Sequence, residues 1–149
     1  MLQVRLFFTA DSASVDARYN SISAFHIMEQ LNAASFPVAI RLCIIALISR
    51  EAADPSRVGL QLLSESGNQR LFSGPVDINF NQMLSARAIL DLQGFVVPSP
   101  GLLRFSLRNG EETLSTWEIV VNQIDQARMQ IHFPMPPNPA PNPAGPGNQ

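Results

Sequence analysis

Residues 98–111 carry the sequence PSPGLLRFSLRNGE and constrain the fold more than any other part of the chain. Apolar and polar side chains alternate through this segment, and one side carries Leu103, Phe105 and Leu107. Alternation with a period of two is typical of a β-strand that buries one face. The pair Asn109-Gly110 follows, and both residues tolerate the positive φ angles of a two-residue turn. The segment therefore predicts a strand that reverses into a β-hairpin.

The same alternation recurs from the N-terminus to residue 122. Eight or nine short strands with turn signals about every ten residues are typical of an antiparallel, immunoglobulin-like β-sandwich. No helical pattern of about 10–15 residues separates them, which argues against a parallel α/β sheet. The side chains expected to face the core, besides those named above, are Leu2, Val4, Leu6, Phe8, Ile40, Leu42, Ile44, Ala46, Ile48, Val58, Leu60, Leu62, Val76, Ile78, Phe80, Ala86, Ala88, Leu90, Leu92, Trp117, Ile119 and Val121.

The turn also predicts a register. A two-residue turn at Asn109-Gly110 pairs Arg108 with Glu111, and this register, continued along the strand, points Trp117 away from the core. Burying an indole is worth more than the one ladder hydrogen bond that a β-bulge gives up. We therefore expect one extra residue near residues 115–116, which returns Trp117 to the core.

Composition restricts the class of protein. The length of 149 residues and the hydrophobic content of 46% suit one globular domain. A formal net charge of −2 argues against nucleic acid as a partner, and the lack of an apolar run of about 20 residues argues against a membrane span. Cys43 is the single cysteine of the sequence, so an internal disulfide is excluded and a cytoplasmic location is expected.

The composition changes at Pro134, and seven of the 12 prolines lie from this residue onward. Proline lacks an N–H and cannot join a sheet ladder, so this part is expected to be a disordered tail. The predicted division is a sandwich over residues 1–122, a tether over residues 123–133 with room for one short strand, and the tail over residues 134–149. Two Pro-x-x-Pro spacings make the tail a candidate ligand for an aromatic groove, and the other interpretation is an inert solubilising tail. The candidate binding residues are Pro134, Pro136, Pro137 and Pro139.

The segment Val38–Ser49 is apolar on both faces. One face is expected to join the core, and the other carries Cys43, Ile45 and Leu47. Two interpretations follow: a central strand that is covered on both sides, or an outer face that binds a partner. The second interpretation makes these three residues candidates for partner binding.

Several further segments resemble a known family. They are residues 9–16 (TADSASVD), residues 22–27, Ser35-Phe36-Pro37 before an apolar strand, residues 90–98 (LDLQGFVVP) and residues 100–105 (PGLLRF). Together they are similar to a family of small, uncharacterised bacterial proteins that look like immunoglobulin-like β-sandwiches. The resemblance covers residues 2–122, and it implies the sandwich fold and a bacterial cell. It implies no catalytic residues, because that family has no established activity.

The sequence shows no spacing typical of a catalytic or metal site. Cys43 lies within an apolar strand, and the two histidines, His26 and His132, belong to no His-x-x-x-His or Cys-x-x-Cys spacing. The aspartates are scattered singly rather than in Asp-x-Asp pairs. Phe7 and Phe95 are the only rings expected to point outward, which is too few for a single-stranded nucleic acid site. We therefore expect no enzyme activity, no cofactor and no metal.

Two functions are favoured, and a third interpretation, a structural subunit of a larger assembly, stays open. The first is a non-enzymatic interaction module that binds another protein, or a second copy of itself, through its apolar outer face, its edge strands or its tail. The second is a sandwich that binds a small ligand, a sugar or a cation through end loops at residues 11–16, 52–57 and 93–98. The second hypothesis requires a concave pocket flanked by all three loops.

Overall fold

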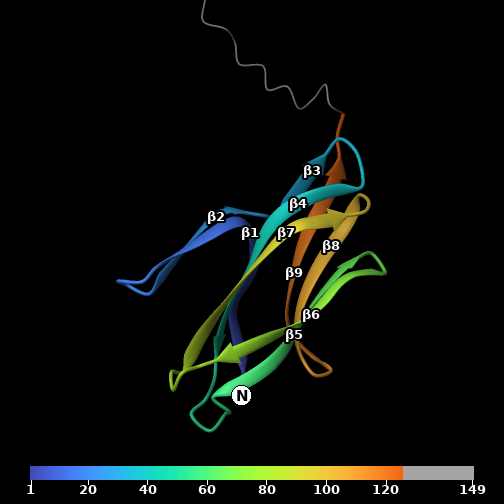
Figure 1. The fold of residues 1–149 in the computed structure, drawn as a ribbon. Coiled ribbons are helices and arrows are strands. Elements are labelled where there is room, and N and C mark those ends of the chain that lie inside the picture. Colours follow the sequence, from blue (N-terminus) through green and yellow to red (C-terminus); the bar gives the residue numbers. More distant parts are fainter. Residues whose placement is uncertain (126–149) are drawn as a thin grey trace, which may run out of the picture.

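The computed structural model describes residues 1–125, which form nine β-strands and no helix (Figure 1). The all-β prediction is confirmed. Within this range, accordingly, no helix has the length and apolar character needed to cross a membrane. The strands are β1 (Gln3–Asp16), β2 (Ser21–Ile27), β3 (Gln30–Ala33), β4 (Val38–Ser49), β5 (Arg57–Ser66), β6 (Gln69–Asn79), β7 (Ser85–Val97), β8 (Gly101–Asn109) and β9 (Glu112–Gln123).

The strands form two sheets, with the orders β2-β1-β4-β7 and β3-β9-β8-β5-β6. In the immunoglobulin fold, strands A, B and E share one sheet and strands C, F and G share the other. In this protein β1, β4 and β7 correspond to strands A, B and E. In the other sheet β5, β8 and β9 correspond to strands C, F and G. The described residues are therefore an immunoglobulin-like β-sandwich, as predicted. β7 and β6 each have a neighbour on one side only, so both are edge strands.

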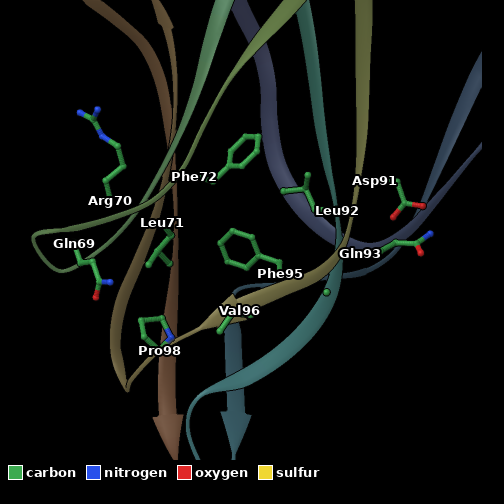
Figure 2. Close-up of a pocket in the computed structure, with 11 residues that line it drawn as sticks. Gln69, Arg70, Leu71, Phe72, Asp91, Leu92, Gln93, Phe95, Val96 and Pro98 are labelled. Atoms are coloured by element: carbon green, nitrogen blue, oxygen red, sulfur yellow. The ribbon is translucent and has the colours of Figure 1, made fainter.

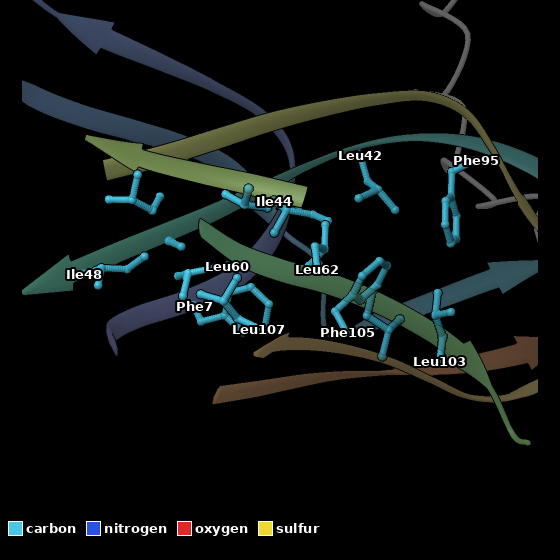
Figure 3. Close-up of a cluster of buried hydrophobic side chains, with 14 of the residues drawn as sticks. Phe7, Leu42, Ile44, Ile48, Leu60, Leu62, Phe95, Leu103, Phe105 and Leu107 are labelled. Carbon is cyan, nitrogen blue, oxygen red and sulfur yellow. The ribbon is translucent and has the colours of Figure 1, made fainter. Parts of the chain in front are cut away.

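The core lies between the sheets and takes side chains from both of them (Figure 3). The inward positions predicted for β4 are confirmed at Leu42, Ile44, Ala46 and Ile48, and those of β7 from Ala86 to Leu92 are half-buried against the same core. The large side chains that are fully buried in this cluster are Leu42, Ile44, Ile48, Leu62, Phe80, Val97, Leu103, Phe105, Leu107 and Ile119.

A β-bulge in β1 changes the faces of its residues. The pairing with β4 shifts between Val4 and Leu6, which places one extra residue in β1. Beyond this point Phe7 is in the core, whereas Leu6 is 51% exposed and Phe8 packs outside the core. The predictions that Leu6 and Phe8 face inward and that Phe7 faces outward were wrong, because one inserted residue exchanges the two faces of a strand.

A second bulge lies in β7. Ile40 pairs with Phe95 and Leu42 with Leu92, so two residues of β7 lie opposite one residue of β4. One of the two is Gly94, whose φ of 67° is the left-handed conformation that this type of bulge needs. The bulge points Phe95 into the core, so the prediction of an outward ring was wrong here as well.

The β8–β9 hairpin forms with a shifted turn. Asn109 pairs with Glu112, so the two turn residues are Gly110 and Glu111, and of these only Gly110 has a positive φ. The predicted pair of Arg108 and Glu111 was wrong by one position. The reason is that a single glycine with positive φ at the first turn position is sufficient for a two-residue turn.

The bulge predicted beside Trp117 is present, one residue earlier than expected, at Leu114. It places Trp117 opposite Phe105, on the face that packs against the core. The indole is half-buried, and its Nε1 donates a hydrogen bond of 3.0 Å to the carbonyl oxygen of Met28. Trp117 thus reaches the core, as predicted.

Several predicted boundaries were wrong. β1 continues to Asp16, where an edge loop was expected, and β7 continues to Val97. β6 runs through Gly74-Pro75, because proline is tolerated in an edge strand that needs no donor on its free side. β2 ends at Ile27, and the short β3 that follows was not predicted. β3 pairs with β9 in parallel, so one pairing in the sandwich is not antiparallel.

Ser64 of β5 is fully buried, and its Oγ has no hydrogen-bond partner among the described residues. A buried hydroxyl without a partner costs about 1–3 kcal/mol. We therefore expect Ser64→Ala to raise the free energy of unfolding by about 1 kcal/mol, measured by urea denaturation. Ser23→Ala, at an exposed position of β2, is the matched control and should change this energy by about 0.5 kcal/mol or less. A Ser64→Ala variant less stable than the parent chain would contradict the prediction.

Candidate functional site

The outer face of β4 is covered. Cys43 is 4% exposed and Ile45 is 2% exposed, and with Ala10 they form a second apolar cluster on the side of the sheet opposite the core. Leu47 is half-buried. Of the two interpretations of the doubly apolar strand, the structure shows the one with both faces covered. Cys43 and Ile45 are therefore not available as surface contacts in this conformation.

The cover is the hairpin of residues 10–27, which we call the arm. Ala13, Ile22 and Ala24 of the arm pack against the Cys43 cluster. At the tip, Nη2 of Arg87 on β7 donates hydrogen bonds to the backbone oxygen of Asn20 at 2.6 Å and to its Oδ1 at 2.9 Å. Because β4 lies between β1 and β7 in the sheet, the arm must cross the outer face of β4 to make these contacts.

Some apolar surface remains beside the arm. Leu6 and Val15 are about half exposed, and Ile89 is 37% exposed. Val15 and Ile89 line a shallow depression together with Leu47 and Arg87. These residues are the accessible rim of the face on which sequence reasoning placed partner binding.

The proline candidates Pro134, Pro136, Pro137 and Pro139 lie outside the described residues. The described chain ends at Asp125, two residues after β9. The backbone N–H of Ile124 still donates a hydrogen bond of 3.0 Å to the carbonyl oxygen of Ala33, so ordered pairing continues just past the predicted domain boundary at residue 122.

A groove with a volume of about 680 Å³ lies between the edge strands β6 and β7 (Figure 2). We call it the edge groove. Leu71 and Phe72 from β6 and Leu92 and Phe95 from β7 point into the space between the strands. Gln69, Arg70, Asp91, Gln93, Gly94, Val96 and Pro98 complete its lining. The edge groove therefore has an apolar, aromatic floor and a polar rim.

Bulges on both strands shape the edge groove. β7 has its bulge at Gln93 and Gly94, and β6 has one at Leu71, because Ser64 pairs with Phe72 while Glu65 pairs with Arg70. A bulge interrupts the regular row of backbone donors and acceptors on an edge strand. Neither edge therefore offers a straight ladder to an added β-strand at this point, although the side chains form a continuous floor.

Gly74 supports one wall of the edge groove. A Cβ atom at this position would lie 2.8 Å from the ζ carbon of the Phe72 ring, so the ring lies directly over the glycine. Any larger residue must displace the ring. Gly74 and Phe72 together provide a way to alter the edge groove at a half-buried ring on the periphery of the core.

Asp91, the acidic residue of the rim, forms an ion pair with Arg41. Arg41 of β4 donates two hydrogen bonds to Asp91, from Nε at 3.2 Å and from Nη2 at 2.8 Å. The hydrogen bonds from Arg41 hold the pKa of the Asp91 carboxyl below its ordinary value. Figure 2 shows the Asp91 side chain pointing away from the apolar floor. The carboxylate is thus paired with Arg41 at the rim and does not face the apolar floor.

This pair predicts a pH dependence. Because the pKa of Asp91 is lowered on folding, its contribution to stability is present above the unfolded pKa and is lost as the pH falls through the folded value. A carboxyl NMR titration should show that the pKa of Asp91 lies below the ordinary aspartate value of about 3.9. Arg41→Gln should raise that pKa towards the ordinary aspartate value, and an unchanged Asp91 pKa in this variant would exclude the ion pair as the cause.

The described residues bring together little that supports catalysis or metal binding. His26 is exposed and has a φ of 54°, and its Nδ1 lies 3.6 Å from Oδ2 of Asp11, a pair that sequence reasoning missed. Within residues 1–125 no three His, Cys, Asp or Glu side chains gather in a way that could hold a metal ion. Cys43 is a buried free thiol on a different face from the edge groove.

The end loops of the ligand-binding hypothesis do not meet. Residues 11–16 belong to β1, and residues 93–97 belong to β7. Residues 52–56 precede β5 at the end of the sandwich that carries the N-terminus, and the β7–β8 turn lies at the other end (Figure 1). The pocket that this hypothesis requires, flanked by all three segments, is not formed by the described residues.

Sequence reasoning missed the edge groove. Gly94 within an alternating strand is a local signal of the bulge in β7. Nothing local indicates that β6 and β7 are edge strands of facing sheets, because that depends on the order of all nine strands.

Two solved structures are among those similar to this chain. A solved immunoglobulin-like protein from Pseudomonas aeruginosa is similar over 82% of this chain and 97% of its own length, at 12% identity and a TM-score of 0.45. A β-glucosidase from Listeria innocua in complex with glucose is similar over 84% of this chain, at 12% identity and a TM-score of 0.46. The chain spans only 16% of that enzyme.

No curated protein matches the sequence. The model of the DUF6941 family, a family of unknown function, matches residues 5–122 and thus nearly the whole described sandwich. The chain therefore belongs to the DUF6941 family.

Proposed function

We propose that this chain is a non-enzymatic protein-interaction module of the bacterial cytoplasm, and that it binds an extended peptide segment in the edge groove. The observation that carries the proposal is the aromatic floor formed by Phe72 and Phe95 between two edge strands. Concave, largely apolar sites with a few polar groups at the rim are the usual form of a binding pocket. The single, buried cysteine supports the cytoplasmic location.

The form of the edge groove favours one class of ligand. The two bulged edges oppose addition of a regular β-strand, which needs an unbroken ladder. A polyproline II segment needs no ladder, and aromatic grooves are its usual receptors. Its free carbonyl groups require donors, and Gln69, Arg70 and Gln93 provide N–H groups at the rim. The proposed ligand is therefore a proline-rich segment.

The proposal is tested by NMR titration of the ¹⁵N-labelled full chain. The probes are a proline-rich peptide, a Val/Thr-rich strand-forming peptide and a Gly/Ser peptide. The proline-rich peptide should cause saturable shifts at the amides of Phe72, Gly94 and Phe95. The titration is repeated on a chain in which the four candidate prolines of the tail are replaced by serine, so that a competing tail does not hide binding.

Phe72→Ala removes half of the aromatic floor and should abolish these shifts. Phe25→Ala, which removes a ring that is 51% exposed on the arm, is the matched control and should leave them unchanged. Circular dichroism checks that both variants keep the β-sheet spectrum. The proposal fails if no peptide class shifts the edge groove amides in either chain.

The rim beside the arm supports a second interaction, between copies of the chain. Leu6, Val15 and Ile89 are exposed apolar residues next to half-buried Leu47. Exposed apolar patches are typical of association surfaces. Light scattering should then show concentration-dependent dimers that Leu6→Arg removes. A chain that stays monomeric at all concentrations would exclude self-association without affecting the edge groove.

A further inference from the structure

We infer that the edge groove is occupied by the proline-rich tail of the same chain, through the segment from Pro134 to Pro139. This inference rests on the proposed function, because it names the ligand of the same site. It assigns the tail a binding role within the molecule and makes it a competitor of any outside partner.

The position of the chain end supports the inference. Val121 of β9 pairs with Gly101 of β8, and Pro98, three residues before Gly101, lines the edge groove. Figure 1 shows the end of β9 and the β7–β8 turn at the same end of the sandwich. The path from Asp125 runs along four residues to Val121, crosses about 5 Å to Gly101, and runs along three residues to Pro98. At no more than about 3.5 Å per residue, Asp125 lies within about 30 Å of Pro98.

The length of the intervening chain is sufficient. Nine residues separate Asp125 from Pro134 along the sequence, counting Pro134 itself, and nine extended residues span up to about 30 Å. The tail can therefore reach the groove from its own sandwich, without a second copy.

The segment and the groove also match in length and chemistry. Six residues in polyproline II conformation extend about 19 Å. Residues 91–96 of β7 line the groove, and six strand residues extend about 20 Å. The segment from Pro134 to Pro139 has the sequence PMPPNP, which carries no charge and suits an apolar floor whose nearest carboxylate, Asp91, is paired with Arg41.

Tethering makes even weak docking significant. A segment on a short flexible linker has an effective concentration of the order of millimolar. If the free segment binds with a Kd of the order of 100 µM, the tethered segment occupies the groove about nine-tenths of the time. An outside peptide then binds about tenfold more weakly than it would to an empty groove.

The first test measures this competition. The probe is a synthetic peptide of residues 126–149, titrated onto the full chain and onto the full chain with Pro134, Pro136, Pro137 and Pro139 replaced by serine. We expect the peptide to bind the serine variant about tenfold more tightly. Equal affinity for the two chains would overturn the inference and leave the edge groove as a peptide site. Binding to neither chain, together with a negative peptide panel, would overturn the proposed function as well.

The second test locates the tail in the intact chain. Cys43 is buried, so Asn138→Cys adds the one thiol expected to react with a nitroxide label, and the parent chain controls for labelling of Cys43. The label should weaken the amide signals of Phe72, Gly94 and Phe95 and spare that of Asn32 on β3. Gly74→Ala, which displaces the Phe72 ring, should reduce this effect while the fold is kept.

A mixed sample distinguishes the two sources of the tail. One chain carries ¹⁵N but no spin label, and it is combined with a chain that carries the spin label but no ¹⁵N. Signal loss at the groove in this mixture, comparable to that in the sample whose chains carry both labels, would assign the tail to a second copy and overturn docking within one chain. Signal loss spread evenly over the sandwich, or absent everywhere, would also overturn it.

Discussion

Replacing Phe105 with alanine is expected to lower the free energy of unfolding by about 3–5 kcal/mol. Phe105 is fully buried, and its ring lies 5.7 Å from that of Phe95, with an angle of 42° between the ring planes. The substitution removes this contact and leaves a cavity that rigid β-strands close only in part. Guanidinium or urea denaturation measures the loss.

The size of this effect follows from the place of Phe105 in the fold. It lies on β8, in the middle of the larger sheet, and faces Trp117 on β9 and Ser64 on β5. Domains are stable by only about 5–15 kcal/mol, so the variant loses a large share of the total. Phe25→Ala, at a half-exposed ring of the arm, should cost about 0.5 kcal/mol or less. Similar losses for the two variants would contradict the assignment of the core.

Ile45→Ala is expected to cost about 2–5 kcal/mol. Ile45 is on the outer face of β4, where an ordinary sheet residue would meet water, but it is 2% exposed beneath the arm. The loss should be measured on the isolated chain, with no partner present. A core-sized effect on an outer face is expected only if the arm covers this residue in solution.

Leu6→Ala is the matched control for this prediction. Leu6 also lies on the outer face, but it is 51% exposed, and its truncation should cost about 1 kcal/mol or less. If Ile45→Ala were as mild as Leu6→Ala, the arm would not cover the face. The interpretation of Cys43, Ile45 and Leu47 as an open docking surface would then be the correct one.

Local patterns were sufficient for β4 and β8. The segment Val38–Ser49 was predicted with both of its ends and with its core-facing side chains, and β8 was predicted with Leu103, Phe105 and Leu107 inward. These predictions held because alternation of side chains is a property of the strand itself. Trp117 was placed correctly by an energetic argument, since the burial of an indole outweighs a regular register.

The bulges could not be located from such patterns alone. One inserted residue in β1 and another in β7 reversed the expected faces of Phe7 and Phe95. A strand with apolar residues at adjacent positions satisfies either register, so the partner strand decides between them.

Considered by itself, the amino-acid order determined an all-β sandwich, its main core residues and a proline-rich end of different character. Only the tertiary structure decided that the second apolar face of β4 lies beneath the arm and that β6 and β7 are facing edges with a groove between them. The physical reason is distance along the chain. The arm and β4, like β6 and β7, meet only when the whole strand order is assembled, and no local propensity encodes which surface is left uncovered.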